Sequence, residues 1–237
     1  MAKYKLSIIV PVYNEEQDIV NNLRKISREV LKLKADIGLF IVNDGSTDNT
    51  RILLGKLENK LNFFLINQNN KGYGGAIKIG AKKAFEQGYD YGLFMDSDLT
   101  NPPEFIKDFL NLITSGYDII KADRFLKKSN MSEVPFKRRM FSIGANFVAS
   151  LCFRLGIRDY TNGFRAINLK KFLSMKLKEN HFPIIMEEMY YVKKFNLKIT
   201  NITTTLKSRL EGSKKSSFEY DIKTLTSYLK YCIMSIK

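Results

Sequence analysis

Tryptophan is absent from this sequence of 237 residues, and histidine and cysteine are nearly so. The two cysteines, Cys152 and Cys232, lie far apart without the spacing of metal ligands, so neither a disulfide framework nor a zinc site is indicated. The single histidine, His181, cannot build a histidine-rich metal site or relay by itself. We therefore expect a reduced protein whose chemistry depends on other residue types.

Long apolar runs are also missing. No segment approaches the ~18 consecutive apolar residues that a membrane-spanning helix needs. The N-terminal run Ile8–Val10 ends at Pro11, too early for a signal peptide. The default expectation is a cytoplasmic protein.

Apolar and basic residues are plentiful. Hydrophobic residues make up 44% of the chain and charged residues 27%, so a sizeable core can form and wholesale disorder is excluded. Lysine and arginine outnumber aspartate and glutamate by 39 to 24, a formal net charge of +15. This excess predicts an acidic partner, which is a nucleic acid, an anionic membrane face or a phosphorylated small molecule. The charge alone does not choose among them.

The first half of the chain alternates short apolar runs with amphipathic stretches. The runs predict strands at 6–10, 38–42, 62–67, 91–95 and 118–122. Helical spacing predicts helices at 18–33, 47–57, 74–87 and 103–115, the second capped by Ser46 or Thr47. Strands that alternate with helices in this way form βαβ units, so we expect an α/β fold with a mostly parallel sheet.

The second half follows another pattern. It has a basic amphipathic stretch at 136–155, a short strand near Phe164, a helix near Glu187, a strand near Ile199 and a last amphipathic helix at 218–236. Repeats and linkers are not evident. We expect one domain, with a nucleotide-binding half at about 1–124 and an acceptor half at 125–237.

Polar clusters follow several of the predicted strands. In open α/β sheets, ligands bind outside the carboxyl ends of the strands, and these clusters would converge there. They are Tyr13-Asn14-Glu15, Asn43-Asp44-Gly45-Ser46, Asp96-Ser97-Asp98 and Arg124.

Asp96 and Asp98 form the sharpest of these clusters. Two carboxylates two residues apart, directly after an apolar strand, can share one hard cation, and Mg²⁺ or Mn²⁺ suits a site that also binds a diphosphate. The alternative is a cap for the helix that begins at Pro103, although several residues intervene. A glycine-rich stretch at 71–76 resembles a phosphate loop only weakly, and a turn that caps the next helix explains it better.

Five segments in order resemble the motifs of glycosyltransferase family 2. Three are VPVYNE at 10–15, VNDGSTD at 42–48 and MDSDL at 95–99; DYTNGFR at 159–165 and RLEGSKK at 209–215 are similar to the polyprenyl-phosphate branch of that family. The resemblance implies a catalytic domain of the GT-A fold over 1–237. It also implies inverting transfer of a sugar from a UDP- or GDP-linked donor to a polyprenyl phosphate, assisted by Mg²⁺ or Mn²⁺.

The resemblance also implies roles for single residues. Pro11, Tyr13 and Glu15 match positions that line the base and ribose pocket, and Asp44 matches the acid that holds the base. Asp96 and Asp98 match the metal-binding pair, Asp98 being the more direct ligand, with Asp96 also at the nucleotide. Arg124, Arg209 and Lys215 match phosphate-binding positions. Outside the resemblance, Arg139 is a further predicted phosphate ligand, with a surface charge as the alternative.

Some positions depart from the family pattern. Asn43 stands where aspartate is common, and Ala122-Asp123 replaces a Gly-Ser pair before Arg124. Lys214 shifts the late Ser-Lys step by one residue, which leaves open whether Lys214 or Lys215 clamps the phosphate.

The acceptor is predicted from the need for a base. A sugar hydroxyl usually needs a positioned carboxylate to remove its proton, whereas a lipid phosphate is already ionised near neutrality. Asp98, Arg124 and Glu187 are the predicted catalytic residues, and Glu187 or its neighbour Glu188 would orient the acceptor or the donor sugar while the other is solvated. The alternative is a saccharide hydroxyl acceptor with one of these glutamates as the base.

The stretch 121–158 is the predicted contact with the membrane. It carries nine basic residues, Lys121 and Arg124 included, against Asp123 and Glu133, with interleaved phenylalanines. Such a segment can lie among lipid headgroups or pack on the core with a basic outer side. We expect the last helix to use its apolar face for core or interface packing, and the protein to lie at the cytoplasmic face of a membrane. Nucleic-acid binding is less favoured, since it would not explain Asp96 and Asp98.

Overall fold

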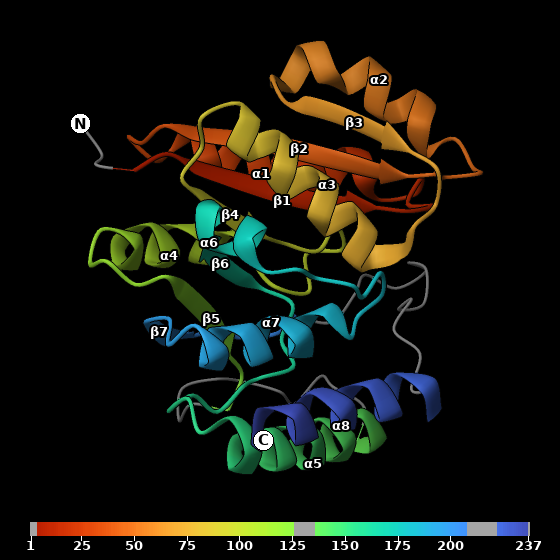
Figure 1. Cartoon of the computed structure of the whole chain (residues 1–237). Coiled ribbons are helices and arrows are strands. Elements are labelled where there is room, and N and C mark those ends of the chain that lie inside the picture. Colours follow the sequence, from red (N-terminus) through yellow and green to blue (C-terminus); the bar gives the residue numbers. More distant parts are fainter. Residues whose placement is uncertain (1–3, 126–135, 208–221, 237) are drawn as a thin grey trace.

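The computed structural model describes residues 4–125, 136–207 and 222–236. In that part of the chain, seven strands form one sheet in the order β3-β2-β1-β4-β6-β5-β7 (Figure 1). They are β1 (Leu6–Val12), β2 (Ile37–Asp44), β3 (Phe64–Gln68), β4 (Tyr91–Phe94), β5 (Ile119–Asp123), β6 (Arg165–Asn168) and β7 (Ile199–Thr203). Strand β6 is antiparallel to both of its neighbours, and all other pairs are parallel. The predicted mostly parallel sheet is confirmed.

Helices flank the sheet on both faces. They are α1 (Ile19–Leu31), α2 (Thr50–Leu61), α3 (Gly72–Glu86), α4 (Ile106–Ile113) after a 3₁₀ turn at Pro103–Phe105, α5 (Phe136–Phe153), α6 (Leu169–Ser174), α7 (Ile184–Lys194) and α8 (Ile222–Ile236). Helix α6 was not predicted, since six residues are too few for a helical period to be recognised. A local signal exists, because the Asn168 side chain accepts the Lys171 N–H at 3.1 Å and so caps this helix.

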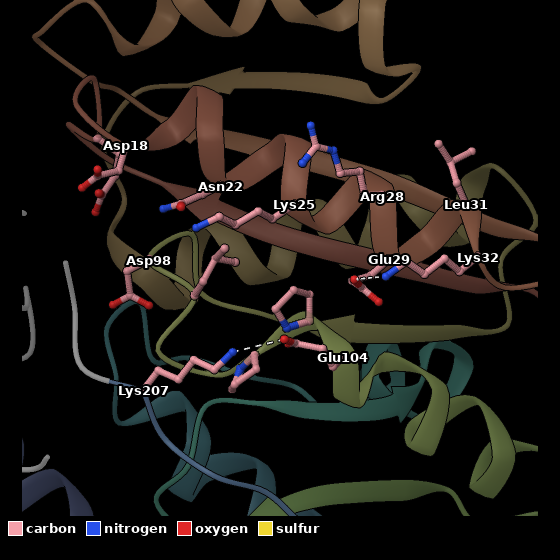
Figure 2. Close-up of a pocket in the computed structure, with 14 residues that line it drawn as sticks. Asp18, Asn22, Lys25, Arg28, Glu29, Leu31, Lys32, Asp98, Glu104 and Lys207 are labelled. Atoms are coloured by element: carbon pink, nitrogen blue, oxygen red, sulfur yellow. Dashed lines mark hydrogen bonds and ion pairs between the residues drawn. The ribbon is translucent and has the colours of Figure 1, made fainter.

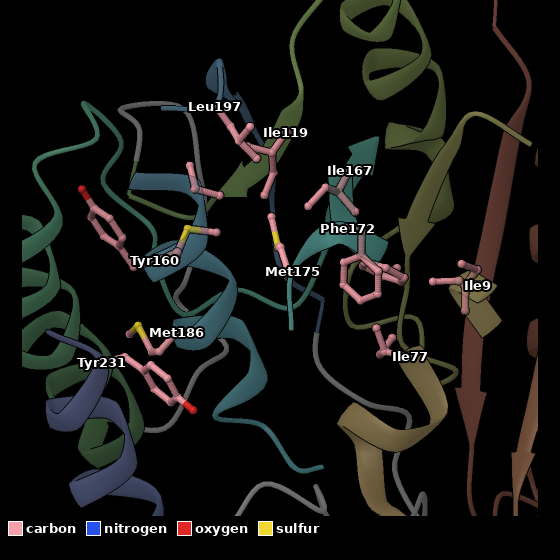
Figure 3. Packing of buried hydrophobic residues seen from close by; sticks show 14 of the residues in the cluster. Ile9, Ile77, Ile119, Tyr160, Ile167, Phe172, Met175, Met186, Leu197 and Tyr231 are labelled. Carbon is pink, nitrogen blue, oxygen red and sulfur yellow. The ribbon is translucent and has the colours of Figure 1, made fainter. Parts of the chain in front are cut away.

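Burial on both faces explains the unbroken apolar runs of the central strands. On β1, Leu6, Ile8 and Val10 pack with α1, α2 and α4, whereas Ile9 belongs to the core on the other face. That second core includes residues of α3, α6 and α7 and continues to Tyr231 on α8 (Figure 3). Helix α3 comes close to β1 at Gly80, where a Cβ would lie 2.5 Å from Ile9 Cγ2.

A fully buried ion pair joins β6 to α7. Nε and Nη2 of Arg165 donate to the two carboxylate oxygens of Glu188, and both side chains are fully buried. The third nitrogen, Nη1, donates to the carbonyl of Gly163 at 2.6 Å and to the Tyr73 hydroxyl at 3.2 Å. The guanidinium also lies 4.7 Å from the ring centre of Phe94 on β4. Burial by itself would lower the pKa of Arg165, but Glu188 and Tyr73 outweigh it and raise the pKa.

In the described part of the chain, we find no helix that combines the length and the apolar character needed to cross a bilayer.

We expect Glu188→Gln to destabilise the fold strongly. Glutamine keeps the shape of the side chain but leaves the Arg165 charge buried without a counter-ion, a change that typically costs about 3–5 kcal/mol. The free energy of unfolding in urea measures the loss. Asp36→Asn is the matched control, because it removes the exposed 3.0 Å pair with Lys5 and should change stability little. Equal losses in the two variants would contradict the importance given to the buried pair.

Candidate active site

The loops that follow β1 and β2 are tied together at the carboxyl edge of the sheet. Asn14, at a φ of 54°, donates its N–H to Ser46 Oγ at 3.0 Å, and its Oδ1 accepts the N–H of Thr47 at 2.7 Å. The prediction that Ser46 or Thr47 caps the next helix is therefore wrong. Helix α2 begins later, at Thr50, because both residues are engaged with Asn14.

The residues predicted to line the base and ribose pocket lie on the first of these loops. Pro11 and Glu15 are half-buried, and the Tyr13 side chain is exposed. The backbone N–H of Glu15 donates to Thr50 Oγ1 at 2.8 Å, which fixes the loop to the start of α2. Their contact with a nucleotide stays a prediction.

Asp44, at the end of β2, is buried and holds the start of α3. Its Oδ1 accepts from Gln68 Nε2 at 2.6 Å and from the N–H of Lys71 at 2.9 Å, and its Oδ2 accepts the N–H of Gly72 at 2.8 Å. A carboxylate at a helix N-terminus is favourable, since it satisfies unpaired N–H groups and the helix dipole. The stretch at 71–76 is thus a capped helix start.

Asp96 and Asp98 directly follow β4, and both are half-buried. The turn between them is held by Asn22 of α1, whose Nδ2 donates to the Ser97 carbonyl at 3.0 Å. Oδ1 of Asp98 accepts from the N–H and the hydroxyl of Thr100, at 3.0 and 2.9 Å. The alternative of a helix cap is not supported, because the 3₁₀ turn at Pro103 has no side-chain cap.

The donor set fits a divalent cation that is shared with a ligand. The residues of the described ranges include no cluster of three or more histidine, cysteine or acidic side chains that could enclose a metal. A pair of carboxylates two residues apart, such as Asp96 and Asp98, instead suits Mg²⁺, which usually takes its other oxygen ligands from phosphates and water.

A pocket of about 620 Å³ runs from Asp98 along α1 (Figure 2). Its walls come from α1 and from the segment 98–104, and Lys207 reaches in from the strand β7 side. The lining is of mixed charge, with Lys25 and Arg28 on one wall and a 3.1 Å ion pair between Lys207 and Glu104 on the other.

Arg124 directly follows β5, and its guanidinium group is bound by the carboxylate of Asp159. Nε and Nη2 donate to the two carboxylate oxygens at 2.6 and 2.7 Å, and Nη2 also donates to Thr161 Oγ1 at 2.7 Å. Burial opposes ionisation of Asp159, but Arg124 keeps the pKa of this carboxyl below its usual value. The structure thus gives Arg124 a defined place at the site edge, and its contact with a phosphate stays a prediction.

The expectation that one of the two glutamates on α7 is solvated is wrong, because both are buried. Glu188 pairs with Arg165, as described above. The Glu187 carboxylate accepts the backbone N–H groups of Lys178 and Glu179, with all three contacts at 2.9 Å. The geometry therefore gives Glu187 a structural role, and the predicted catalytic role has no support in it.

Of the other residues predicted to bind phosphate, only Arg139 is described, and it is exposed on α5. Arg209, Lys214 and Lys215 lie outside the described residues. Lys121, counted with the basic membrane-facing stretch, is completely buried, so that assignment is wrong for it.

Helices α5 and α8 pack together and expose apolar side chains. We call these side chains the α5–α8 apolar surface; they are Met140, Ile143, Phe147, Val148 and Leu151 of α5 and Leu229, Ile233, Met234 and Ile236 of α8. For the last helix we expected core or interface packing of its apolar face. Helix α8 buries Tyr228, Tyr231 and Cys232 in the core and exposes Leu229, Ile233 and Ile236, for which an interface stays a prediction.

Sequence reasoning missed Tyr73, which lies between Asp96 and the buried pair of Arg165 and Glu188. A Cβ at Gly163 would meet the Tyr73 hydroxyl at 3.1 Å and Asp96 Oδ2 at 3.8 Å, so these three residues adjoin. Burial raises the pKa of Tyr73, so it stays a neutral phenol. Its place in the glycine-rich stretch gave no hint of this position.

Comparisons with known proteins identify the family of this chain. The family model "Glycosyl transferase family 2" matches residues 7–174. A dolichol-phosphate mannosyltransferase of Pyrococcus furiosus is 28% identical over 98% of this chain, and the chain spans 64% of that protein's length. A UDP-N-acetylglucosamine–dolichyl-phosphate N-acetylglucosaminyltransferase of Methanococcus voltae is 27% identical over 85% of each protein.

A solved structure supports the fold. The structure of glucosyl-3-phosphoglycerate synthase of Mycobacterium tuberculosis, solved with Mn²⁺, UDP and glucosyl-3-phosphoglycerate, superposes with a TM-score of 0.68 at 16% identity. The match covers 99% of this chain and 79% of that one. The expected GT-A architecture is confirmed, and since the family model covers well over half of the sequence, the chain belongs to glycosyltransferase family 2.

Proposed function

We propose that this protein is an inverting, metal-dependent glycosyltransferase that moves a sugar from a UDP- or GDP-linked donor to a polyprenyl phosphate. The acidic turn Asp96-Ser97-Asp98 carries the proposal, because it lies beside the loops after β1 and β2 at the carboxyl edge of the sheet. The names of the two curated relatives, both transferases that use a dolichol phosphate, support the acceptor class.

In this proposal Asp96 and Asp98 would hold Mg²⁺ or Mn²⁺ at the donor site. The cation would supply positive charge to the departing nucleoside diphosphate. Pro11, Tyr13, Glu15 and Asp44 border the nucleoside. A phosphate oxygen of the acceptor forms the new bond to the anomeric carbon while the bond from that carbon to the diphosphate breaks, and attack from the opposite face inverts the configuration.

The hydrogen bonds and the ion pair that occupy the two glutamates of α7 favour a phosphate acceptor. A saccharide hydroxyl would need a carboxylate base, and Glu187 and Glu188 were the candidates. Glu187 is bound to backbone N–H groups and Glu188 to Arg165. An ionised phosphate needs no such base.

We further propose that the α5–α8 apolar surface contacts the cytoplasmic face of a membrane. Exposed arginines accompany it, namely Arg139 and Arg154 on and just after α5, and Arg158. Exposed apolar side chains with neighbouring cations suit an anionic lipid surface, which is where the phosphate of a polyprenyl phosphate lies.

Asp98→Asn should lower sugar transfer by at least about 100-fold, the scale expected for loss of a group that stabilises developing charge. Asparagine keeps an Oδ1 that accepts from Thr100, so the turn should persist. Transfer from labelled UDP- and GDP-sugars to polyprenyl phosphate is measured with and without Mn²⁺. EDTA should abolish the wild-type activity, and Asp36→Asn should retain it. Full transfer by Asp98→Asn in EDTA would overturn the metal site.

The acceptor class is tested with the wild-type protein. Radiolabelled sugar should enter the chloroform-soluble lipid-phosphate fraction and be released from it by mild acid. Incorporation into glycan without any labelled lipid phosphate would instead favour the hydroxyl acceptor.

Phe147→Asp combined with Leu151→Asp should reduce binding to phosphatidylglycerol vesicles at least tenfold, because two exposed apolar contacts are replaced by charges that the anionic surface repels. Cosedimentation measures the bound fraction. Ile52→Asp on α2, a similarly exposed apolar residue on another part of the molecule, is the matched control and should bind like the wild type. Equal binding by all three proteins would remove the α5–α8 surface from the proposal.

A further inference from the structure

Lys121 is a buried cation that none of the roles above uses. It lies on β5, its side chain is completely buried, and Nζ donates to the carbonyls of Tyr160 at 3.2 Å and Asn162 at 2.9 Å. None of the ion pairs among the described residues includes it. A charged ammonium held only by carbonyls is unusual, since buried charges are normally paired.

The segment that Lys121 holds is the turn between α5 and β6, at 159–164. Within this turn the N–H of Asn162 donates to Asp159 Oδ1 at 3.1 Å, and the N–H of Phe164 donates to Asn162 Oδ1 at 3.0 Å. One end of the turn carries Asp159, the partner of Arg124, and the other carries Gly163, which adjoins Asp96. Lys121 therefore fixes the backbone that connects two parts of the candidate site.

Four charged groups on neighbouring segments act electrostatically on Lys121. They are Arg165 on β6, Glu188 on α7, Asp159 in the turn and Arg124 after β5. Arg124 and Asp159 neutralise each other, as do Arg165 and Glu188. A protonated Lys121 thus leaves this group of five with one positive charge in excess, close to the acidic turn where we place the donor diphosphate.

Lys121 can change its charge near neutral pH. Burial, and next the Arg165 guanidinium, lower the pKa of Lys121 to about 7. A bound anion near the cluster would favour the charged form and raise this pKa, and by linkage the charged form would bind the anion more tightly.

We propose that Lys121 is a positioning residue of this site: its amine holds the 159–164 turn against Asp96, and its charge couples binding of the donor diphosphate to uptake of a proton. The coupling rests on the proposed donor site, whereas the hold on the turn does not.

The coupling is tested by calorimetry of UDP with Mn²⁺ at pH 8 in two buffers of different ionisation enthalpy. The wild type should take up roughly half a proton or more per bound UDP, and its affinity should fall as the pH rises from 7 to 9. Lys121→Met should take up none and bind with an affinity that is flat with pH. Lys56→Met, which changes an exposed lysine of α2, should behave like the wild type. Equal proton uptake by Lys121→Met would overturn the coupling.

Two further measurements keep the outcomes distinct. If Lys121→Met does not fold, the ¹³Cε resonance of Lys121 is followed in the wild type. It should titrate near pH 7, and its midpoint should shift to higher pH when UDP and Mn²⁺ are added. An unchanged titration would overturn the coupling.

If the wild type binds neither UDP nor pyrophosphate with Mn²⁺, the donor site itself fails. The hold on the turn is then tested by hydrogen exchange of the 160–164 amides, which should be at least tenfold faster in Lys121→Met than in the wild type or Lys121→Arg; equal exchange would overturn it.

Discussion

One antiparallel strand inside a parallel sheet determines where the site residues meet. Strands β4 and β5 are parallel to each other, so both end at the carboxyl edge of the sheet, where the candidate site lies. Because β6 runs the other way between them, it is the beginning of β6 that reaches the same edge, and the register places Arg165 beside Phe94 on one side and Lys121 on the other. The turn that precedes β6 is thereby delivered to Asp96. With a parallel strand in this position, the turn would lie at the opposite edge of the sheet.

This arrangement concentrates charge in the interior. The two ion pairs, Arg124 with Asp159 and Arg165 with Glu188, are both bidentate, which is the geometry in which a buried pair best offsets its desolvation. They fix the 159–164 turn to the end of β5 and helix α7 to β6 before any ligand arrives. Such preorganisation is what electrostatic catalysis requires.

The sequence predicted the strands and most helices, because the central strands are unbroken apolar runs and the helices of the first half have clear periods. It also located the acidic turn, since Asp96 and Asp98 follow an apolar strand directly. The partners of charged residues were not predictable. Nothing local shows that Glu188 faces inward, or that Lys121 lies on an interior strand rather than a basic surface, because both facts depend on the position of β6. The partners of Glu187 lie at residues 178 and 179, which the pattern around α7 does not reveal either. The predicted cap of α2 was wrong for a similar reason, because Ser46 and Thr47 bind Asn14, which lies on a loop distant in the sequence.

The position of β6 also constrains the order in which the chain can assemble during synthesis. Strands β1 to β4 are contiguous in the sheet, so this part can pair as soon as the ribosome has released it. Strand β5 then emerges with neither of its neighbours yet made, since both β6 and β7 follow it in the chain. Until β6 arrives, the nascent protein presents one open edge on β4 and an unpaired apolar strand, and both are features that chaperones recognise and that favour aggregation. Strand β6 therefore both brings the 159–164 turn to Asp96 and joins β5 to the strands that pair first.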